Sequence, residues 1–125
     1  MLAAEVYEPR RVRVHQVPVP KWGPDDALLR IQVCGICGSD VHRYLMDAYG
    51  SRFRYPLNSG HEFAAQVVSV GERVTNISPD QRVTGHPQWV QFGGAFAEYL
   101  LVPEADRNLI SVEGSGKANK YSVIE

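Results

Sequence analysis

The sequence predicts a mainly β domain, a compact and barrel-like antiparallel arrangement with one or two short helices. Short apolar stretches of strand length recur along the chain, glycine and proline turns separate them, and only the stretch after Gly38 suits a helix. The chain has 125 residues, of which 44% are hydrophobic and 22% charged, so it can bury the core of one globular domain.

Residues 5–20 are predicted to form the first strand. Val12 and Val14 alternate there with basic and polar residues, which is the period of a half-buried strand. Pro18 and Pro20 would end the strand, since proline cannot donate to a sheet ladder. The interleaved basic side chains are interpreted as a solvated face of the strand.

Residues 27–33 predict a second, more central strand that leads into a glycine-rich turn. A short helix is expected after that turn, capped by Ser39 or Asp40 and reaching about Ala48. Further strands are expected at 61–70, 81–84 and 95–102.

The pattern fades near Ser111, where glycine, serine and lysine replace apolar residues. The sequence thus predicts one domain over residues 1–110 and a linker-like tail over residues 111–125.

Charge and hydropathy exclude two classes of partner. The net charge of −1 gives no basic surface for nucleic acid or an anionic membrane. No apolar run approaches the roughly 20 residues that span a bilayer, and the N-terminus lacks a basic start followed by an apolar segment. A soluble, cytoplasmic protein is therefore expected.

Residues capable of chemistry gather in two clusters between Cys34 and Glu62. The first is Cys34-Gly-Ile-Cys37-Gly-Ser-Asp-Val-His42 and the second is Gly60-His61-Glu62. Thiol, imidazole and carboxylate groups together suit a divalent metal, above all zinc. If the elements pack together, Cys37 and His61 could converge on such an ion, with Glu62 beside them.

Three neighbouring residues could support such a site. Ser39 and His42, on the predicted helix, could pass a proton from a metal-bound hydroxyl towards solvent. Asp40 could accept a hydrogen bond from His61 and hold its tautomer, as metal-bound histidines usually require.

Other interpretations of the two cysteines remain open. Cys37 could be a core thiol and His61 a core histidine. The Cys34-x-x-Cys37 pair could be a thioredoxin-like redox motif or half of a zinc knuckle, although no further cysteine pair exists to complete a structural zinc site.

These motifs, in this order, resemble the N-terminal GroES-like catalytic domain of zinc-dependent medium-chain alcohol and polyol dehydrogenases. The resemblance also includes Gly93-Gly-Ala-Phe-Ala-Glu-Tyr99 and covers roughly residues 1–110. The form of the first cluster is most similar to that of sorbitol-type and threonine dehydrogenases.

The resemblance implies a GroES-like, partly open β-barrel in which one zinc polarises the hydroxyl of a small alcohol or polyol for hydride transfer to NAD or NADP. Cys34 would pack behind the loop. Six residues would carry the chemistry: Cys37 and His61 as zinc ligands, Glu62 as a neighbouring or alternating ligand, Ser39 and His42 as the proton relay, and Asp40 as the partner of His61.

Three departures from the family pattern qualify the resemblance. The interval 84–91 holds no cysteine, which excludes the structural zinc that many members carry. Ala65 and Asp80 stand where glycine is usual. No Gly-x-Gly-x-x-Gly turn follows residue 110, so the chain is expected to be a catalytic half without a dinucleotide-binding domain and inactive alone.

Two other functions compete with this interpretation. The domain could be a non-enzymatic GroES-like assembly or binding module, self-associating through the surface that the absent domain would cover. A weaker alternative is a thiol redox protein that uses Cys34 and Cys37.

Overall fold

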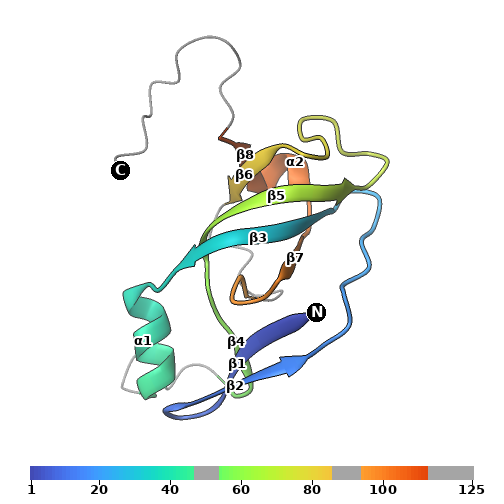
Figure 1. Ribbon diagram of the computed structural model, residues 1–125. Coiled ribbons are helices and arrows are strands. Elements are labelled where there is room, and N and C mark those ends of the chain that lie inside the picture. The colour runs from blue at the N-terminus through green and yellow to red at the C-terminus, as the bar shows by residue number, and fades with distance from the viewer. Residues whose placement is uncertain (47–53, 86–93, 113–125) are drawn as a thin grey trace.

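A computed structural model of the protein describes residues 1–46, 54–85 and 94–112, which form two antiparallel sheets and two short helices (Figure 1). One sheet has the order β2-β1-β4 and the other β7-β3-β5-β6-β8. The strands are β1 (Leu2–Glu8), β2 (Arg11–Gln16), β3 (Ala27–Gly35), β4 (Leu57–Asn58), β5 (Glu62–Val70), β6 (Arg82–Gly85), β7 (Tyr99–Val102) and β8 (Leu109–Ser111). The mainly β, partly open arrangement predicted from the sequence is confirmed.

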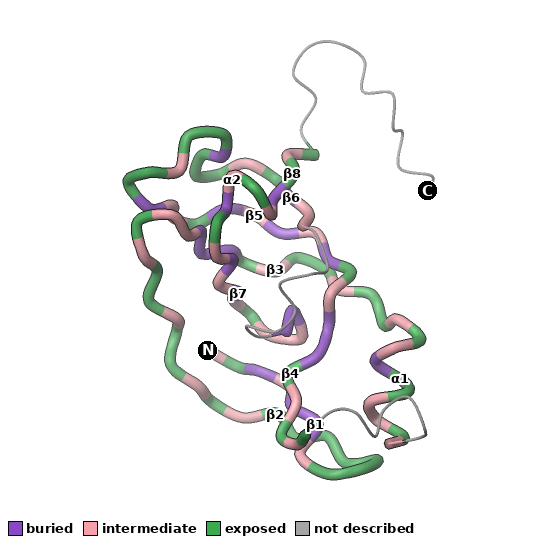
Figure 2. The backbone as a smooth tube through the Cα atoms, turned by 180° about the vertical axis from the view of Figure 1, so that it is seen from behind, coloured by how far each residue is buried: buried purple, intermediate pink, exposed green. Residues whose placement is uncertain are grey.

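The five-stranded sheet contains the core. Its central strands, β3 and β5, pair along most of their length, and both contribute buried residues to the core (Figure 2). The largest side chains that are fully buried all come from this sheet: Leu29, Val67, Val83 and Val102. The prediction of a central strand at 27–33 is confirmed, with β3 continuing to Gly35.

The prediction of one strand over residues 5–20 is wrong. The chain instead forms a hairpin of β1 and β2, turning at Pro9 and Arg10, where Arg10 adopts a φ of 63°. The strand β2 lies at the edge of its sheet, and Val12 and Val14 are 54% and 65% exposed rather than half-buried. The buried strand of the pair is β1, in which Val6 is 7% exposed.

Helix α1 (Gly38–Leu45) stands beside the end of β3 that leads into it (Figure 1). The predicted caps are wrong, because Cys37 is the N-cap and Asp40 lies at the third helical position. The helix is also shorter than expected: Met46 terminates it in a left-handed conformation, while Ala48 lies outside the described residues.

The last described part of the chain contains elements that the sequence did not reveal. The predicted strand at 95–102 is regular only from Tyr99 as β7, and helix α2 (Ala105–Asn108) follows it. Strand β8 then pairs with β6. The short strand β4 was also missed, and most of the predicted tail lies outside the described residues.

Neither α1 nor α2, the helices found in the described ranges, is long and apolar enough to cross a membrane.

Candidate metal centre

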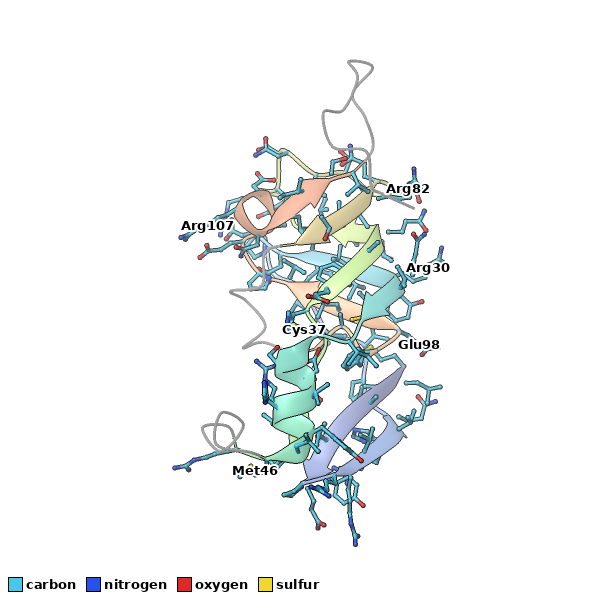
Figure 3. All side chains as sticks on the ribbon, turned by 90° about the vertical axis from the view of Figure 1, so that its left-hand side faces the viewer. Arg30, Cys37, Met46, Arg82, Glu98 and Arg107 are labelled. Carbon is cyan, nitrogen blue, oxygen red and sulfur yellow. The ribbon has the colours of Figure 1, made fainter. Side chains whose placement is uncertain are left out.

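Three side chains that could hold a metal ion meet where β3, α1 and β5 come together. One ligand atom from each of Cys37, His61 and Glu62 lies within 4.8 Å of the others. The β3–β5 ladder creates this proximity, because it pairs Gly35 with Glu62 and so places the residues after β3 beside the start of β5. Figure 3 shows Cys37 at the end of α1 nearest the five-stranded sheet.

Asp40 fixes the first turn of α1 against this cluster. Its Oδ2 accepts a hydrogen bond of 3.0 Å from the backbone N–H of Cys37, which satisfies a donor that a helix N-terminus would otherwise leave unpaired. Its Oδ1 accepts one of 3.2 Å from the backbone N–H of Gly60. One buried carboxylate thus holds the backbones of both sequence clusters in place.

The His61 ring lies between Asp40 and Ser39. Its Nδ1 is 3.6 Å from Asp40 Oδ1, a charge-pair distance rather than the hydrogen bond expected from the sequence, and its Nε2 is 3.3 Å from Ser39 Oγ. The side chains of His61 and Asp40 are 13% and 5% exposed. With Nδ1 directed at the carboxylate, Nε2 is the nitrogen available to a metal.

Two of the remaining sequence candidates, Glu62 and His42, have exposed side chains. His42 lies one helical turn beyond Ser39, so these two residues share a face of α1 that runs from His61 towards solvent. Their order along the helix fits a proton relay, and that role stays a prediction.

Cys34 does not join the three donor side chains. It is partly buried and packs against the hydrophobic core, and burial is the main cause that raises the pKa of its thiol. A raised pKa reduces the thiolate fraction at neutral pH, which disfavours the redox alternative.

Sequence reasoning missed Arg43. Its guanidinium Nη1 lies 3.9 Å from Asp40 Oδ1, and its side chain is 14% exposed. The spacing of three positions from Asp40 on a predicted helix was the available signal. The positive charge of Arg43 lies near the Asp40 oxygen that also faces His61, and this helps to offset the cost of burying the Asp40 carboxylate.

An open cavity of about 650 Å³ lies beside the candidate centre. His61 and Glu62 line it together with Val33, Phe63 and Thr84. A small molecule in this cavity could therefore reach the donor atoms of His61 and Glu62.

Comparison with known proteins places this architecture in a family. Residues 23–113 match the model of the alcohol dehydrogenase GroES-like domain. An L-threonine 3-dehydrogenase from Ruegeria pomeroyi is 36% identical over 112 residues, which cover 70% of this chain and 33% of that protein.

Solved structures agree with this relationship. A zinc-dependent alcohol dehydrogenase 2 from Streptococcus pneumonia superposes with a TM-score of 0.78 at 27% identity, covering 90% of this chain and 39% of that one. A proposed zinc-binding dehydrogenase from Sinorhizobium meliloti, bound to NADP, superposes with a TM-score of 0.71 at 30% identity. The superposition covers 90% of this chain and 38% of that one.

The chain spans about a third of the length of the curated relatives that it matches. The family match covers most of the residues that form the two sheets, and it includes both clusters of the candidate centre. This protein therefore belongs to the family of the alcohol dehydrogenase GroES-like domain.

Proposed function

We propose that this chain is the zinc-binding catalytic part of an alcohol or polyol dehydrogenase that uses NAD or NADP. The convergence of Cys37, His61 and Glu62 within 4.8 Å is the observation that supports this most directly. A thiolate, an imidazole and a carboxylate are donors that catalytic zinc sites use. The dehydrogenase relatives support the reaction class.

Five residues of this chain would hold the zinc or move the substrate proton. Cys37 Sγ and His61 Nε2 would hold the ion, and Glu62 would ligate it or lie beside it. A bound zinc would polarise the substrate hydroxyl and lower its pKa. Ser39, in contact with His61 Nε2 in the structure, would accept the hydroxyl proton and pass it towards His42 at the helix surface.

The proposed division of the protein assigns residues 1–110 to the catalytic domain and residues 111–125 to a linker. The nicotinamide would be bound by a separate dinucleotide-binding domain, in keeping with the greater length of the relatives and the NADP in one related structure. One zinc is proposed per chain, because Cys34 and Cys37 are the only cysteines in the sequence and cannot supply a second, structural site.

Metal analysis of the purified chain tests the proposal. We expect about one zinc per chain, and a much weaker affinity, measured by competition with a chromogenic chelator, in Cys37→Ser and His61→Gln. Cys34→Ser is the matched control and should bind zinc as the parent does. A parent chain that takes up no zinc would refute the metal centre, and NAD-linked oxidation by the chain alone would refute the separate cofactor domain.

A second candidate function is a non-enzymatic binding or assembly module. Exposed apolar side chains favour it, since Ile36 is 75% exposed and Val14 on the edge strand β2 is 65% exposed. Size-exclusion chromatography with and without a zinc chelator separates the candidates. A stable oligomer that is indifferent to chelation, formed by a chain without zinc, would favour assembly over catalysis.

A further inference from the structure

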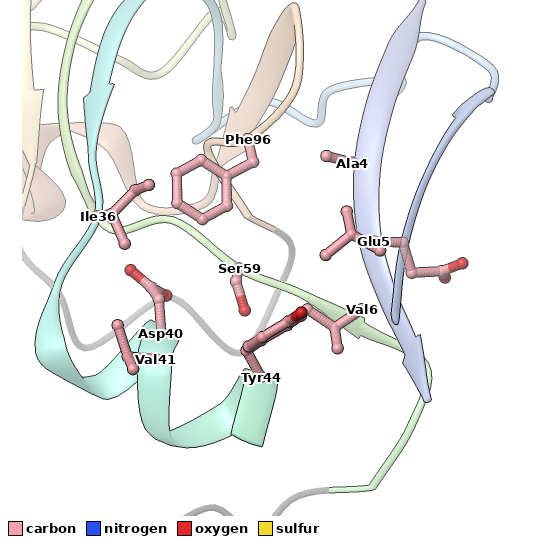
Figure 4. A pocket seen from close by; sticks show the side chains of 10 residues that line it. Ala4, Glu5, Val6, Ile36, Asp40, Val41, Tyr44, Ser59 and Phe96 are labelled. Atoms are coloured by element: carbon pink, nitrogen blue, oxygen red, sulfur yellow. The ribbon is translucent and has the colours of Figure 1, made fainter. Parts of the chain in front are cut away.

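A second cavity lies between helix α1 and strand β1, and Asp40 lies between it and the candidate metal centre. It has a volume of about 250 Å³, and none of the three cluster residues lines it. Figure 4 shows Ile36, Val41 and Tyr44 on one side and Val6 on the other, with Phe96 beside Ile36. Ile36 and Val41 are 75% and 45% exposed, so they form a mouth open to solvent.

The charged residues that line this cavity are engaged elsewhere. Glu5 accepts a hydrogen bond of 2.6 Å from Arg13, and its carboxylate points away from the cavity in Figure 4. Asp40 uses its two oxygens for the backbone N–H groups of Cys37 and Gly60. The space therefore offers little to a charged molecule, because a charge buried there would lack a free partner.

Ser59 supplies the polar feature of the cavity. The residue is 3% exposed, and its Oγ has no hydrogen-bond partner among the described residues. Figure 4 shows this side chain pointing into the space between α1 and β1. A buried hydroxyl without a partner is unfavourable, so such a group in a native protein calls for an explanation.

Water is a poor occupant of this cavity. A buried water needs two to four polar partners, and apart from the hydroxyls of Ser59 and Tyr44 the lining side chains named above are apolar or already engaged, which is too little for the several waters that this volume would hold. An apolar cavity of about 150 Å³ is large enough for benzene, so 250 Å³ accommodates roughly ten non-hydrogen atoms.

We propose that this cavity is a binding site for a small, neutral, mostly apolar molecule that carries one hydrogen-bonding group. The apolar part contacts Val6, Val41, Tyr44 and Phe96, and the polar group pairs with the hydroxyl of Ser59. This site shares Asp40 with the candidate metal centre but none of the three candidate ligands, and it does not depend on the proposed dehydrogenase function.

Methyl-resolved NMR titration of the full 125-residue chain tests the site with two probes, benzyl alcohol and toluene. Both should give saturable shifts at the methyl groups of Val6, Ile36 and Val41. Benzyl alcohol should bind about three- to tenfold more tightly, as expected for one hydrogen bond. Val33 lines the metal-side cavity and reports any binding there.

Two variants examine the two parts of the proposal. Ser59→Ala should bind benzyl alcohol no more tightly than toluene, because the polar partner is gone. Val41→Phe should weaken both probes by narrowing the mouth. Val68→Phe is its matched control, a valine of similar exposure (44%) that does not line the cavity, and should leave both affinities unchanged.

Several outcomes would overturn the proposal. Shifts confined to Val33, or no saturable shifts at the cavity methyl groups, would show that the cavity is not a ligand site. An unchanged preference for benzyl alcohol in Ser59→Ala would remove the role of the hydroxyl. Dilution-dependent changes at the same methyl groups without a probe would identify a second copy of the chain as the occupant instead.

Discussion

Asp40 connects three parts of the candidate centre through one carboxylate. It accepts hydrogen bonds from the backbones of Cys37 and Gly60, and its Oδ1 lies 3.6 Å from His61 Nδ1. At 5% exposure this carboxylate is shielded from solvent, so its interactions are stronger than those of a surface group. A single substitution here should disturb both the helix start and the histidine.

We expect Asp40→Asn to weaken zinc binding by about 10- to 100-fold, the usual effect of altering the partner of a metal-bound histidine. The change removes the charge that faces His61 and replaces one acceptor oxygen with an amide NH2 group, which can only donate hydrogen bonds. Chelator competition measures the affinity, and Glu72→Gln, which changes an exposed carboxylate just beyond the opposite end of β5, is the control. Equal zinc affinity in Asp40→Asn and the parent would contradict this role.

Gly60 is held in a conformation that other residues rarely adopt. Its φ is 94°, and an added Cβ would lie 2.8 Å from Phe96 N and 2.9 Å from Cys34 Sγ. Gly60→Ala should therefore lower the free energy of unfolding by about 1–3 kcal/mol, measured by urea denaturation.

Gly38 provides the matched control for that substitution. An added Cβ at Gly38 would meet no atom within 4 Å, and alanine is favoured over glycine in a helix. Gly38→Ala should leave stability unchanged or raise it slightly. Equal losses for the two alanine variants would show that the conformation of Gly60 does not matter.

The residues of the candidate centre were more predictable than their contacts. Residue chemistry together with the family resemblance was enough to predict Cys37, His61 and Glu62 as candidate ligands, because few residue types can bind zinc. The 3.6 Å separation of His61 and Asp40 and the approach of Arg43 were not predictable, since they depend on how α1 packs against β5.

At the scale of elements, α2 is tied to the turn that follows β5. The carboxylate of Asp106 accepts hydrogen bonds from the backbone N–H groups of Thr75 and Asn76 and from the hydroxyl of Thr75. These hydrogen bonds, with the one from Asn76 contributing most, lower the pKa of Asp106 below its ordinary value of 3.8. They favour the charged form, so they stabilise the fold only while this carboxylate is ionised.

The sign of the pH dependence follows from that lowered pKa. The stabilisation by Asp106 is present above the unfolded pKa near 3.8 and is lost as the pH falls through the lower folded value. Asp106→Asn should be less stable than the parent at pH 7, and its urea midpoint should fall less steeply below about pH 4. Parallel midpoint curves for the two proteins would contradict this assignment.

Elements of regular alternation or clear apolar character could be predicted, and shorter ones could not. The sequence predicts one strand in place of the β1–β2 hairpin because the turn uses Pro9 and Arg10 rather than a glycine or asparagine pair. Strands β4 and β8 have two and three residues, too few for a periodic pattern. Their pairing with β1 and β6 is determined by long-range contacts.

For the whole molecule, the two sheets differ in how much they contribute to stability, because the five-stranded sheet buries large side chains and β2 of the other sheet exposes them. Leu29 is 0% exposed in β3, whereas Val14 is 65% exposed in β2. Leu29→Ala should lower the free energy of unfolding by about 2–5 kcal/mol, because it leaves a cavity in the core. Val14→Ala should change it by less than about 0.5 kcal/mol.

Urea denaturation followed by circular dichroism compares these two variants directly. A large loss for Val14→Ala would mean that the exposed face of β2 is covered in solution, as self-association would require. The mainly β class followed from local patterns, but the two-sheet order did not, since neighbouring strands such as β7 and β3 are far apart in sequence.

The β3–β5 ladder also determines which sequence changes the centre can tolerate. It pairs Gly35 with Glu62, so the distance between the donor side chains depends on the number of residues in two paired strands. Adding or deleting one residue in either strand, unless a β-bulge like the two register shifts of this ladder absorbed it, would displace a donor by about 3.3 Å and turn the following side chains to the opposite face. Divergence of this site should therefore proceed through substitutions, with strand length held constant, while changes in length accumulate elsewhere.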